Sequence, residues 1–154
     1  MIDQPQIVST EARPTAVIRF TIPREEIRHV MGPAIAEVMA AVSAQGIGPA
    51  GPMFSCHFRM DPKVFDFEVG VPVSAPVSPV GRVVASQLPA ARVACTVYRG
   101  PYEGLGTAWG EFNEWVMAQG LTPAPSLWEC YVAGPESSAN PAEWRTEFNR
   151  PLVA

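Results

Sequence analysis

The sequence has almost no lysine, no run of basic residues and no long apolar run. Lys63 is the only lysine, and the net charge is −4. Because a nucleic-acid-binding surface needs clustered positive charge, we expect no direct nucleic-acid binding. No apolar stretch approaches the roughly 20 residues that span a bilayer, and the N-terminal segment has no charged start followed by an apolar core. We therefore expect neither a membrane span nor a secretory signal.

Cysteine is also scarce. The three cysteines, Cys56, Cys95 and Cys130, are odd in number and lie within apolar runs. This pattern is typical of buried thiols in a reducing compartment and predicts a cytoplasmic location. Cys56, His57 and Cys130 include zinc-binding atom types but lack the paired spacing of zinc ligands. We expect no metal and no cofactor, since the sequence also has no nucleophile elbow, phosphate loop or dinucleotide fingerprint.

What the sequence does contain is a second copy of itself. Three segments of the first half align with three segments of the second, namely Gln45–Pro49 with Gln119–Pro123, Met53–Phe58 with Leu127–Val132, and Phe67–Val73 with Thr146–Leu152. The offset is 74 residues for the first two pairs and 79 for the third, so the second copy has five extra residues in one loop. A duplication predicts two similar modules related by a pseudo-twofold axis, with a ligand at their seam. The sharpest chemical difference between the copies is Ser55 against Glu129.

Each copy shows the periodicities of a strand, a helix and a strand hairpin. The expected elements are strands at 16–20, 53–60 and 64–69 with a helix from Pro33 to Gly46, and strands at 82–87, 92–98, 127–132 and 144–149 with a helix from Gly100 to Gly120. We predict an α+β fold in which both modules share one antiparallel sheet, with two helices on one face and a ligand groove on the other. The boundaries are about 15–73 for module 1, 74–81 for a linker and 82–153 for module 2, within a single domain spanning 1–154.

Side chains alternate between the two faces of each hairpin strand. We expect the more apolar set to lie beneath the helix, and this set comprises Phe54, Cys56, Phe58, Trp128, Cys130 and Val132. The opposite set then lines the groove, and it comprises Met53, Ser55, His57, Leu127, Glu129 and Tyr131. A carboxylate on such an apolar floor is poorly hydrated and gains free energy when a cation binds. Aromatic faces add about 0.5–2 kcal/mol each through cation–π attraction.

Four further side chains are weaker candidates for ligand contact. Tyr98 and Tyr102 flank the turn at the start of the second helix and are equally compatible with lining the groove or packing. Trp109 lies on the apolar stripe of that helix, which favours a core role. Glu68 occupies the position equivalent to Glu147, and this symmetry favours a structural role, such as capping a turn or an ion pair with Arg145. His57, likewise, is more often a hydrogen-bonded structural residue than a ligand contact.

Several motifs resemble those of the GyrI-like small-molecule-binding family. They are Gly51–Phe54, Phe65–Val73, Leu88–Ala94, Tyr98–Tyr102, Trp128–Tyr131 and Trp144–Glu147, and the resemblance extends from about Thr15 to Leu152. The family comprises effector-binding domains of AraC-type and MerR-type regulators together with stand-alone proteins. The resemblance implies a duplicated module with a groove for hydrophobic, often cationic compounds, and it assigns the main ligand-binding carboxylate to Glu129. Where the family often has a tyrosine, this sequence has His57, which titrates near neutral pH.

Three functions remain open on the sequence alone. The first is a binder of small hydrophobic, cationic or aromatic compounds that sequesters or senses them, and sensing would require a separate DNA-binding protein partner. The second, implied by the resemblance, is a hydrolase that opens strained cyclopropane rings of electrophilic genotoxins, with Glu129 as general base and Tyr131 or His57 as proton donor. The third is an inhibitor that binds a protein target such as DNA gyrase. The oligomeric state is not specified by any of these patterns.

Overall fold

The computed structural model describes residues 2–135 and 137–153. The chain divides into two compact units, and each contains antiparallel strands and one long helix. The continuous unit is Glu11–Ala90, and the split unit combines Met1–Thr10 with Ala91–Ala154. This composition confirms the α+β fold class. Among the described residues, no helix combines the length and apolarity needed to cross a bilayer.

The continuous unit is built on strands that pair in the order β3-β4-β2-β5. Its elements are β2 (Arg13–Pro23), α1 (Ile27–Ala44), β3 (Phe54–Met60), β4 (Val64–Pro72) and β5 (Val84–Leu88), with a short 3₁₀ turn, η1 (Arg24–Glu26). Residues of β2 pair with the whole length of β4, from Thr15 opposite Pro72 to Pro23 opposite Val64. This long ladder is the platform on which α1 packs.

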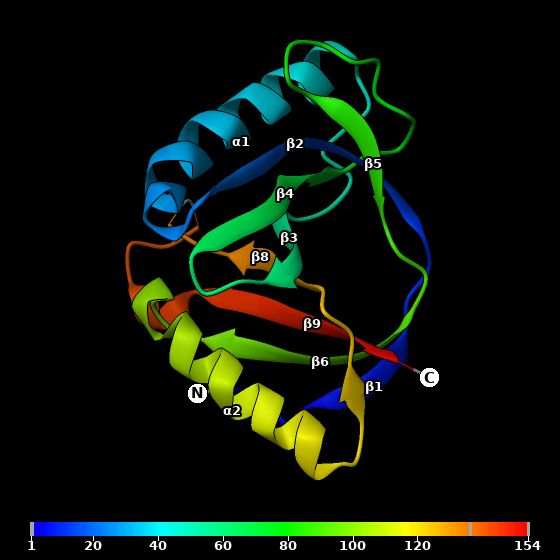
Figure 1. The fold of residues 1–154 in the computed structure, drawn as a ribbon. Helices are drawn as coiled ribbons and strands as arrows, with labels where there is room; N and C mark the ends of the chain where they lie inside the picture. The colour runs from blue at the N-terminus through cyan, green and yellow to red at the C-terminus, as the bar shows by residue number, and fades with distance from the viewer. Residues whose placement is uncertain (1, 136, 154) are drawn as a thin grey trace. The chain divides into compact units, whose positions relative to one another are not determined.

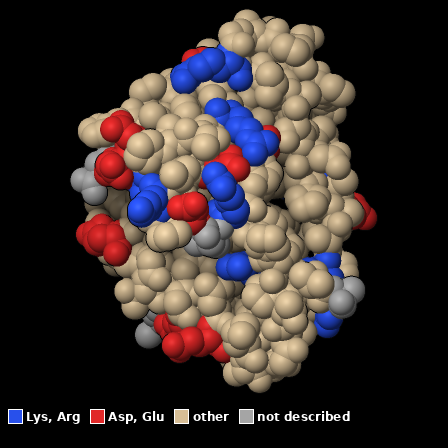
Figure 2. Space-filling model, in the orientation of Figure 1, with Lys and Arg blue, Asp and Glu red and all other residues tan. Residues whose placement is uncertain are grey.

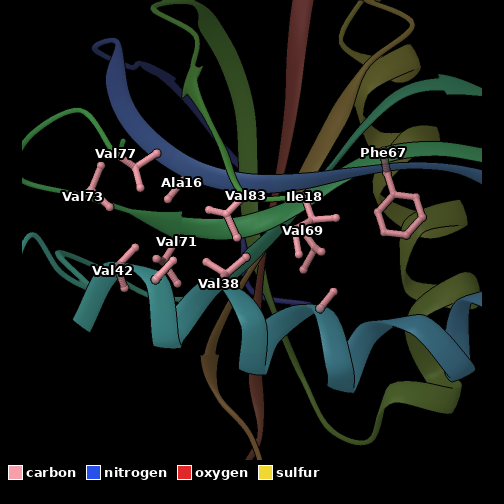
Figure 3. Close-up of a cluster of buried hydrophobic side chains, with 12 residues drawn as sticks. Ala16, Ile18, Val38, Val42, Phe67, Val69, Val71, Val73, Val77 and Val83 are labelled. Atoms are coloured by element: carbon pink, nitrogen blue, oxygen red, sulfur yellow. The ribbon is translucent and has the colours of Figure 1, made fainter. Parts of the chain in front are cut away.

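Helix α1 covers one face of β2 and β4 (Figure 1). Val38 and Val42 of the helix point toward strand side chains that include Ile18 and Val69 (Figure 3). The structure extends the expected helix at its beginning, because Pro33 lies inside α1 rather than at its start. A proline within a helix removes one backbone hydrogen bond, and the apolar contacts of α1 with the strands offset that loss.

The split unit repeats this four-strand plan, with the N-terminal strand β1 in the place that β5 takes in the continuous unit. Its strands pair in the order β1-β6-β9-β8, with β7 added beside β9. The elements are β1 (Gln6–Ser9), β6 (Arg92–Arg99), η2 (Tyr102–Gly104), α2 (Leu105–Ala118), β7 (Thr122–Pro123), β8 (Leu127–Ala133), η3 (Pro141–Glu143) and β9 (Arg145–Val153). Helix α2 packs against β6 and β9 (Figure 1).

The hairpins of the two units have matching registers. In β3–β4, Ser55 lies opposite Val69, and in β8–β9, Glu129 lies opposite Phe148. The register shifts after His57 in one hairpin and after Tyr131 in the other. These positions preserve the offsets of 74 and 79 residues seen in the sequence. The sequence alignment of the two halves therefore describes the pairing geometry of both hairpins.

Some elements differ from the sequence prediction. The strand expected at 82–87 pairs with β2 as β5, and so belongs to the continuous unit rather than to the second module. Strand β1 was not predicted, and it pairs with β6 of the split unit. β2 is also longer than the predicted strand, because it continues past the apolar run in both directions.

Basic and acidic side chains lie beside one another on the face in Figure 2. The continuous unit contains several ion pairs: Arg19 and Arg59 both contact Asp66, at 3.0 and 3.6 Å, and Arg82 contacts Glu37 at 2.9 Å. Arg19 also stacks over the ring of Phe58, at 4.4 Å from its centroid. Much of the positive charge of the continuous unit is therefore held in contacts within that unit.

Candidate functional site

The register corrects the predicted faces of the hairpins. Residues directly opposite one another in an antiparallel pair point to the same side of the sheet. Glu129 is opposite Phe148, and Phe148 packs in the core beneath α2 with Phe112 and Val116. Glu129 therefore points to the helix-bearing side, as does Tyr131, and the prediction that they occupy the opposite face is wrong.

The same correction applies to the continuous unit. His57 is opposite Phe67 and Ser55 is opposite Val69, and both partners belong to the core beneath α1. The prediction failed because both faces of these strands carry buried apolar groups: Phe54 and Trp128, on the faces away from the helices, are as buried as Leu127. Val132, which we expected to be covered by the helix, is 54% exposed.

Glu129 is half-buried as a whole residue, and its carboxyl Oε2 lies at the buried end of the side chain. Burial raises its pKa from 4.5 to about 7, although a hydrogen bond from the Trp109 side chain acts in the opposite direction. Its Oε2 atom is buried and has no hydrogen-bond partner among the described residues. The only other such atoms in the described part of the chain are the hydroxyls of Thr15 and Thr146. In the described part of the chain, Glu129 thus carries the one buried oxygen without a hydrogen-bond partner that can hold a full negative charge.

Trp109 is fixed by stacking as well as by its contact with Glu129. Its ring lies 4.3 Å from that of Phe148 at an interplanar angle of 8°, and 5.6 Å from Phe112. Helix α2 therefore supplies the hydrogen-bond donor, while β9 supplies the ring that orients it. The sequence analysis favoured a core role for Trp109, and the structure shows that it packs in the core and contacts the carboxyl at the same time.

A second aromatic group lies near the start of α2. The ring of Tyr102 is 4.9 Å from Trp144 and 6.0 Å from Tyr131, which it meets edge to face. Trp144 donates a hydrogen bond from Nε1 to the carbonyl of Ser138 at 2.9 Å. The loop after β8 is thereby tied to this cluster. Because Tyr131 shares its face of β8 with Glu129, the three rings extend the same side of the split unit.

Tyr98 and Leu127 are core residues of this unit. Tyr98 is 5% exposed, and its hydroxyl donates to the carbonyl of Pro101 at 2.9 Å. This bond holds the turn that precedes Tyr102. Leu127 is 4% exposed at the first position of β8. Both side chains are buried core residues of the split unit, and the Tyr98 hydroxyl is already engaged by Pro101.

The candidates of the continuous unit pack in an apolar cluster of that unit. His57 is 6% exposed and stacks on Phe67 at 5.1 Å, with Phe65 edge-on at 5.2 Å. Burial, and then the charge of Arg24, lower its pKa to about 4, so the imidazole is neutral at physiological pH. Ser55 is buried beside it, and Met53 packs against the same core. These residues lie on the helix-bearing side of their unit.

Glu68 does not share that side. It lies opposite Cys56 and Arg19, so its side chain points away from α1. Its Oε1 accepts a hydrogen bond from Ser86 Oγ at 2.8 Å, and burial raises its pKa. Glu147 in the split unit accepts from Asn149 Nδ2 at 3.0 Å rather than from Arg145. Both glutamates are thus held by neighbouring polar side chains of their own units.

Arg150 is a buried cation that the sequence analysis did not identify. It lies opposite Ala94 and so faces α2. Its Nε donates to the carbonyl of Ala124 at 3.0 Å and its Nη1 to Asn113 Oδ1 at 3.4 Å, while burial lowers its pKa. Among the described residues, no charged side chain contributes to the pKa shift of Glu129. Arg150 is therefore not the counter-ion of Glu129.

Net charge is unevenly divided between the two units. The continuous unit has seven basic and seven acidic residues, whereas the split unit has four basic and eight acidic residues. The split unit, which holds Glu129, thus carries the whole net charge of −4. Such a surplus favours the approach of cations over anions.

The described residues contain no group of three His, Cys, Asp or Glu side chains that could hold a metal ion.

The arrangement of elements and the sequence pattern together identify the family. The pattern of the GyrI-like small molecule binding domain matches residues 3–152. The chain belongs to this family. The small-molecule-binding role that the family name describes agrees with the resemblance found in the sequence. A comparison with curated proteins found no match.

Solved structures share the fold of this GyrI-like domain. The crystal structure of the EcmrR C-terminal domain matches with a TM-score of 0.83 at 22% identity, covering 97% of each chain. The EcmrR chain in a cryo-EM complex with DNA matches equally well at 23% identity, but this domain spans only 57% of that longer chain. SAV2435 bound to tetraphenylphosphonium matches with a TM-score of 0.68 at 13% identity, covering 99% of this chain and 95% of that one. A hydrolase from Listeria innocua matches with a TM-score of 0.64 at 11% identity, covering 97% and 92%.

Two residues of the Glu129 region were missed in the sequence analysis. Phe148 could have been found, because the offset of 79 residues places it opposite Glu129 once the hairpin is drawn. Trp144 was part of a family motif but was not assigned a role. Its contact with Tyr102 depends on how the loop after β8 folds back, and no sequence periodicity reports that.

Proposed function

We propose that this GyrI-like domain binds small hydrophobic cations, and that Glu129 neutralises their charge. The observation that carries the proposal is a buried carboxyl group whose Oε2 has no partner. A buried charge without a partner is costly, so a cation that enters this environment removes a penalty as well as adding attraction. The acidic surplus of the split unit and the nearby aromatic rings support the same ligand class. We further infer an internal duplication, in which the second copy acquired the carboxylate.

Binding of tetraphenylphosphonium measured by isothermal titration calorimetry tests this proposal. We expect a micromolar Kd for the parent protein and a Kd at least tenfold higher for Glu129→Gln, because the amide keeps the shape but removes the charge. Tetraphenylborate, which has similar size and opposite charge, should not bind. The matched control is Glu114→Gln, which removes a charge from an exposed position on α2. Equal affinity of the parent and Glu129→Gln for the phosphonium would contradict the proposal.

The raised pKa of Glu129 also favours a second candidate, a hydrolase. A general base works best when its pKa is near the operating pH, and that of Glu129 is about 7. In this scheme Glu129 removes a proton from water as the water attacks a strained cyclopropane carbon, and the opening ring takes a proton from Tyr131. His57 is a poor acid here, because its lowered pKa leaves it without a proton at neutral pH.

Mass spectrometry of a cyclopropane-bearing electrophile incubated with the protein tests this candidate. The expected product carries the mass of one added water and forms faster than in buffer. A rate for Glu129→Gln equal to that of the parent would remove the candidate, as would the absence of any product above the buffer rate.

A further inference from the structure

The Glu129 carboxyl offers a hydrogen-bond acceptor as well as a charge. The Trp109 side chain donates one hydrogen bond to the group, whereas Oε2 is buried and receives none from the described residues. A buried acceptor left without a donor costs about 1–3 kcal/mol, and more when it is charged. A ligand that removes this cost must bring a donor to Oε2 and not merely a positive charge nearby.

Hydrophobic cations differ in this respect. A protonated amine or an amidinium carries an N–H that can donate to Oε2 in a charge-assisted hydrogen bond. A quaternary ammonium or phosphonium has no such hydrogen and interacts with the carboxylate through charge alone. The ring of Trp109 is stacked on that of Phe148, with centroids 4.3 Å apart. Because this stacking fixes the ring, its N–H stays with the carboxyl oxygen that it already contacts and leaves Oε2 without a donor among the described residues.

The apolar surroundings increase this difference. Burial raises the pKa of Glu129 to about 7, and hydrogen bonds to an ionised group gain strength when water is excluded. The rings of Tyr131 and Tyr102, 6.0 Å apart and edge to face, provide aromatic surface on the same side of the split unit. A flat aromatic group attached to the cationic nitrogen matches these rings.

We infer that the preferred ligands are aromatic cations that carry an N–H, namely protonated amines or amidinium groups. Their N–H donates to Glu129 Oε2, and they bind more tightly than permanently quaternary cations of the same size. This inference rests on the proposed function, since it specifies which hydrophobic cation the carboxylate selects. It makes Oε2 the atom that determines specificity and Trp109 a positioning residue for the same carboxyl.

A matched pair of probes tests the inference. Chlorpromazine is a tertiary amine that is protonated at neutral pH, and its N-methyl derivative is quaternary but otherwise the same. Titration calorimetry at pH 7.5 should give a Kd for the amine at least tenfold lower than for the quaternary cation. In Glu129→Leu, which removes both charge and acceptor, the ratio of the two Kd values should fall to near one. Glu114→Gln should leave both values unchanged, and circular dichroism confirms that each variant is folded.

The outcomes separate this inference from the proposed function. Equal affinities of the parent protein for the two probes would overturn the N–H preference and leave cation binding intact. A preference for the amine that persists in Glu129→Leu would also overturn it, because the discriminating acceptor would then lie elsewhere. If neither probe nor tetraphenylphosphonium bound more tightly than millimolar, both the inference and the proposed function would be rejected.

Discussion

Glu129, to which we assign ligand binding, also affects the stability of the protein. Burial raises its pKa to about 7, so near neutral pH the group is divided between a protonated form and a charged form. The protonated form suits the apolar interior, and the charged form suits a cationic ligand. We therefore expect the proposed cationic ligand and the proton to compete for the same carboxyl, so both binding and stability should depend on pH.

Affinity for tetraphenylphosphonium should rise with pH. The probe is permanently charged, so any dependence comes from the protein, and only ionised Glu129 attracts it. Because the pKa of Glu129 is about 7, we expect Kd to increase about tenfold for each pH unit below 7 and to be nearly constant above pH 8. Titrations from pH 5.5 to 8.5 measure this. A Kd that is flat over this range in the parent, or an unchanged slope in Glu129→Gln, would argue against Glu129 as the charge-neutralising group.

Folding stability should show the reverse dependence. Because the pKa of Glu129 in the folded protein, about 7, exceeds its ordinary value of 4.5, the folded state binds more protons than the unfolded state between these pH values. The free energy of unfolding therefore falls as pH rises through this window, by about 2–3 kcal/mol for a difference of this size. Glu129→Gln lacks this titration, so its stability relative to the parent should improve by that amount between pH 4.5 and pH 8.

Urea unfolding of both proteins at the two pH values measures the effect. The comparison removes the contribution of His57, whose lowered pKa gives the opposite slope below pH 6.5 in both proteins. A constant difference between variant and parent across the range would show that the carboxyl is better hydrated than its burial indicates.

At the scale of elements, the pairing of the hairpin strands was easier to predict than which face of each hairpin lies beneath the helix. The repeated spacing of the two halves predicted which strands pair, because hairpin register follows from loop length and alternation. The same alternation failed to predict the helix-bearing side. Trp128 and Leu127 are adjacent and both 4% exposed, so the strand has no polar face to mark the solvent side. Likewise β1, at four residues, is too short to produce a periodic signal.

Two glycine substitutions test how closely these elements approach one another. A Cβ at Gly70 in β4 would collide with the backbone oxygen of Ala16 in β2, whereas one at Gly110 in α2 would meet nothing within 4 Å. We expect Gly70→Ala to destabilise the protein by about 2–4 kcal/mol, since neither strand backbone can move aside without losing its pairing. Gly110→Ala should instead stabilise it by about 0.5–1 kcal/mol through helix propensity.

Thermal and urea unfolding of the two variants check these values. Each serves as the control for the other, because both replace glycine by the same residue. Near-parental stability of Gly70→Ala would mean that β2 and β4 tolerate a wider separation than the structure shows.

At the scale of the whole molecule, the N-terminus contributes to the split unit. Strand β1 pairs with β6, Asp3 forms an ion pair with Arg99 at 2.9 Å, and Thr96 donates to the carbonyl of Asp3 at 2.7 Å. The sequence did not reveal this pairing, since β1 precedes β6 by more than eighty residues and belongs to no repeat. Long-range pairing of a short edge strand depends on the fold around it rather than on local pattern.

Deleting residues 1–10 should therefore weaken the unit that contains Glu129. We expect a loss of about 2–3 kcal/mol from the missing strand pairing and side-chain bonds, with faster hydrogen exchange at the backbone amides of β6. Amides of β2 and β4, which pair within the continuous unit, should keep their protection. Hydrogen exchange monitored by mass spectrometry distinguishes the two units, and equal loss of protection in both would contradict the assignment of the N-terminus to the split unit.

The division of the chain has a consequence for biosynthesis. Residues 11–90 form their unit from one uninterrupted stretch, so they can fold while the ribosome is still translating the remainder. The other unit cannot be completed then, because β9, which lies between β6 and β8, ends at Val153. Residues 1–10 belong to the same unit, so they must wait until β6, β8 and β9 have been made. The unit that holds the acidic group that we assign to ligand capture is thus completed only once the chain has been made as far as Val153.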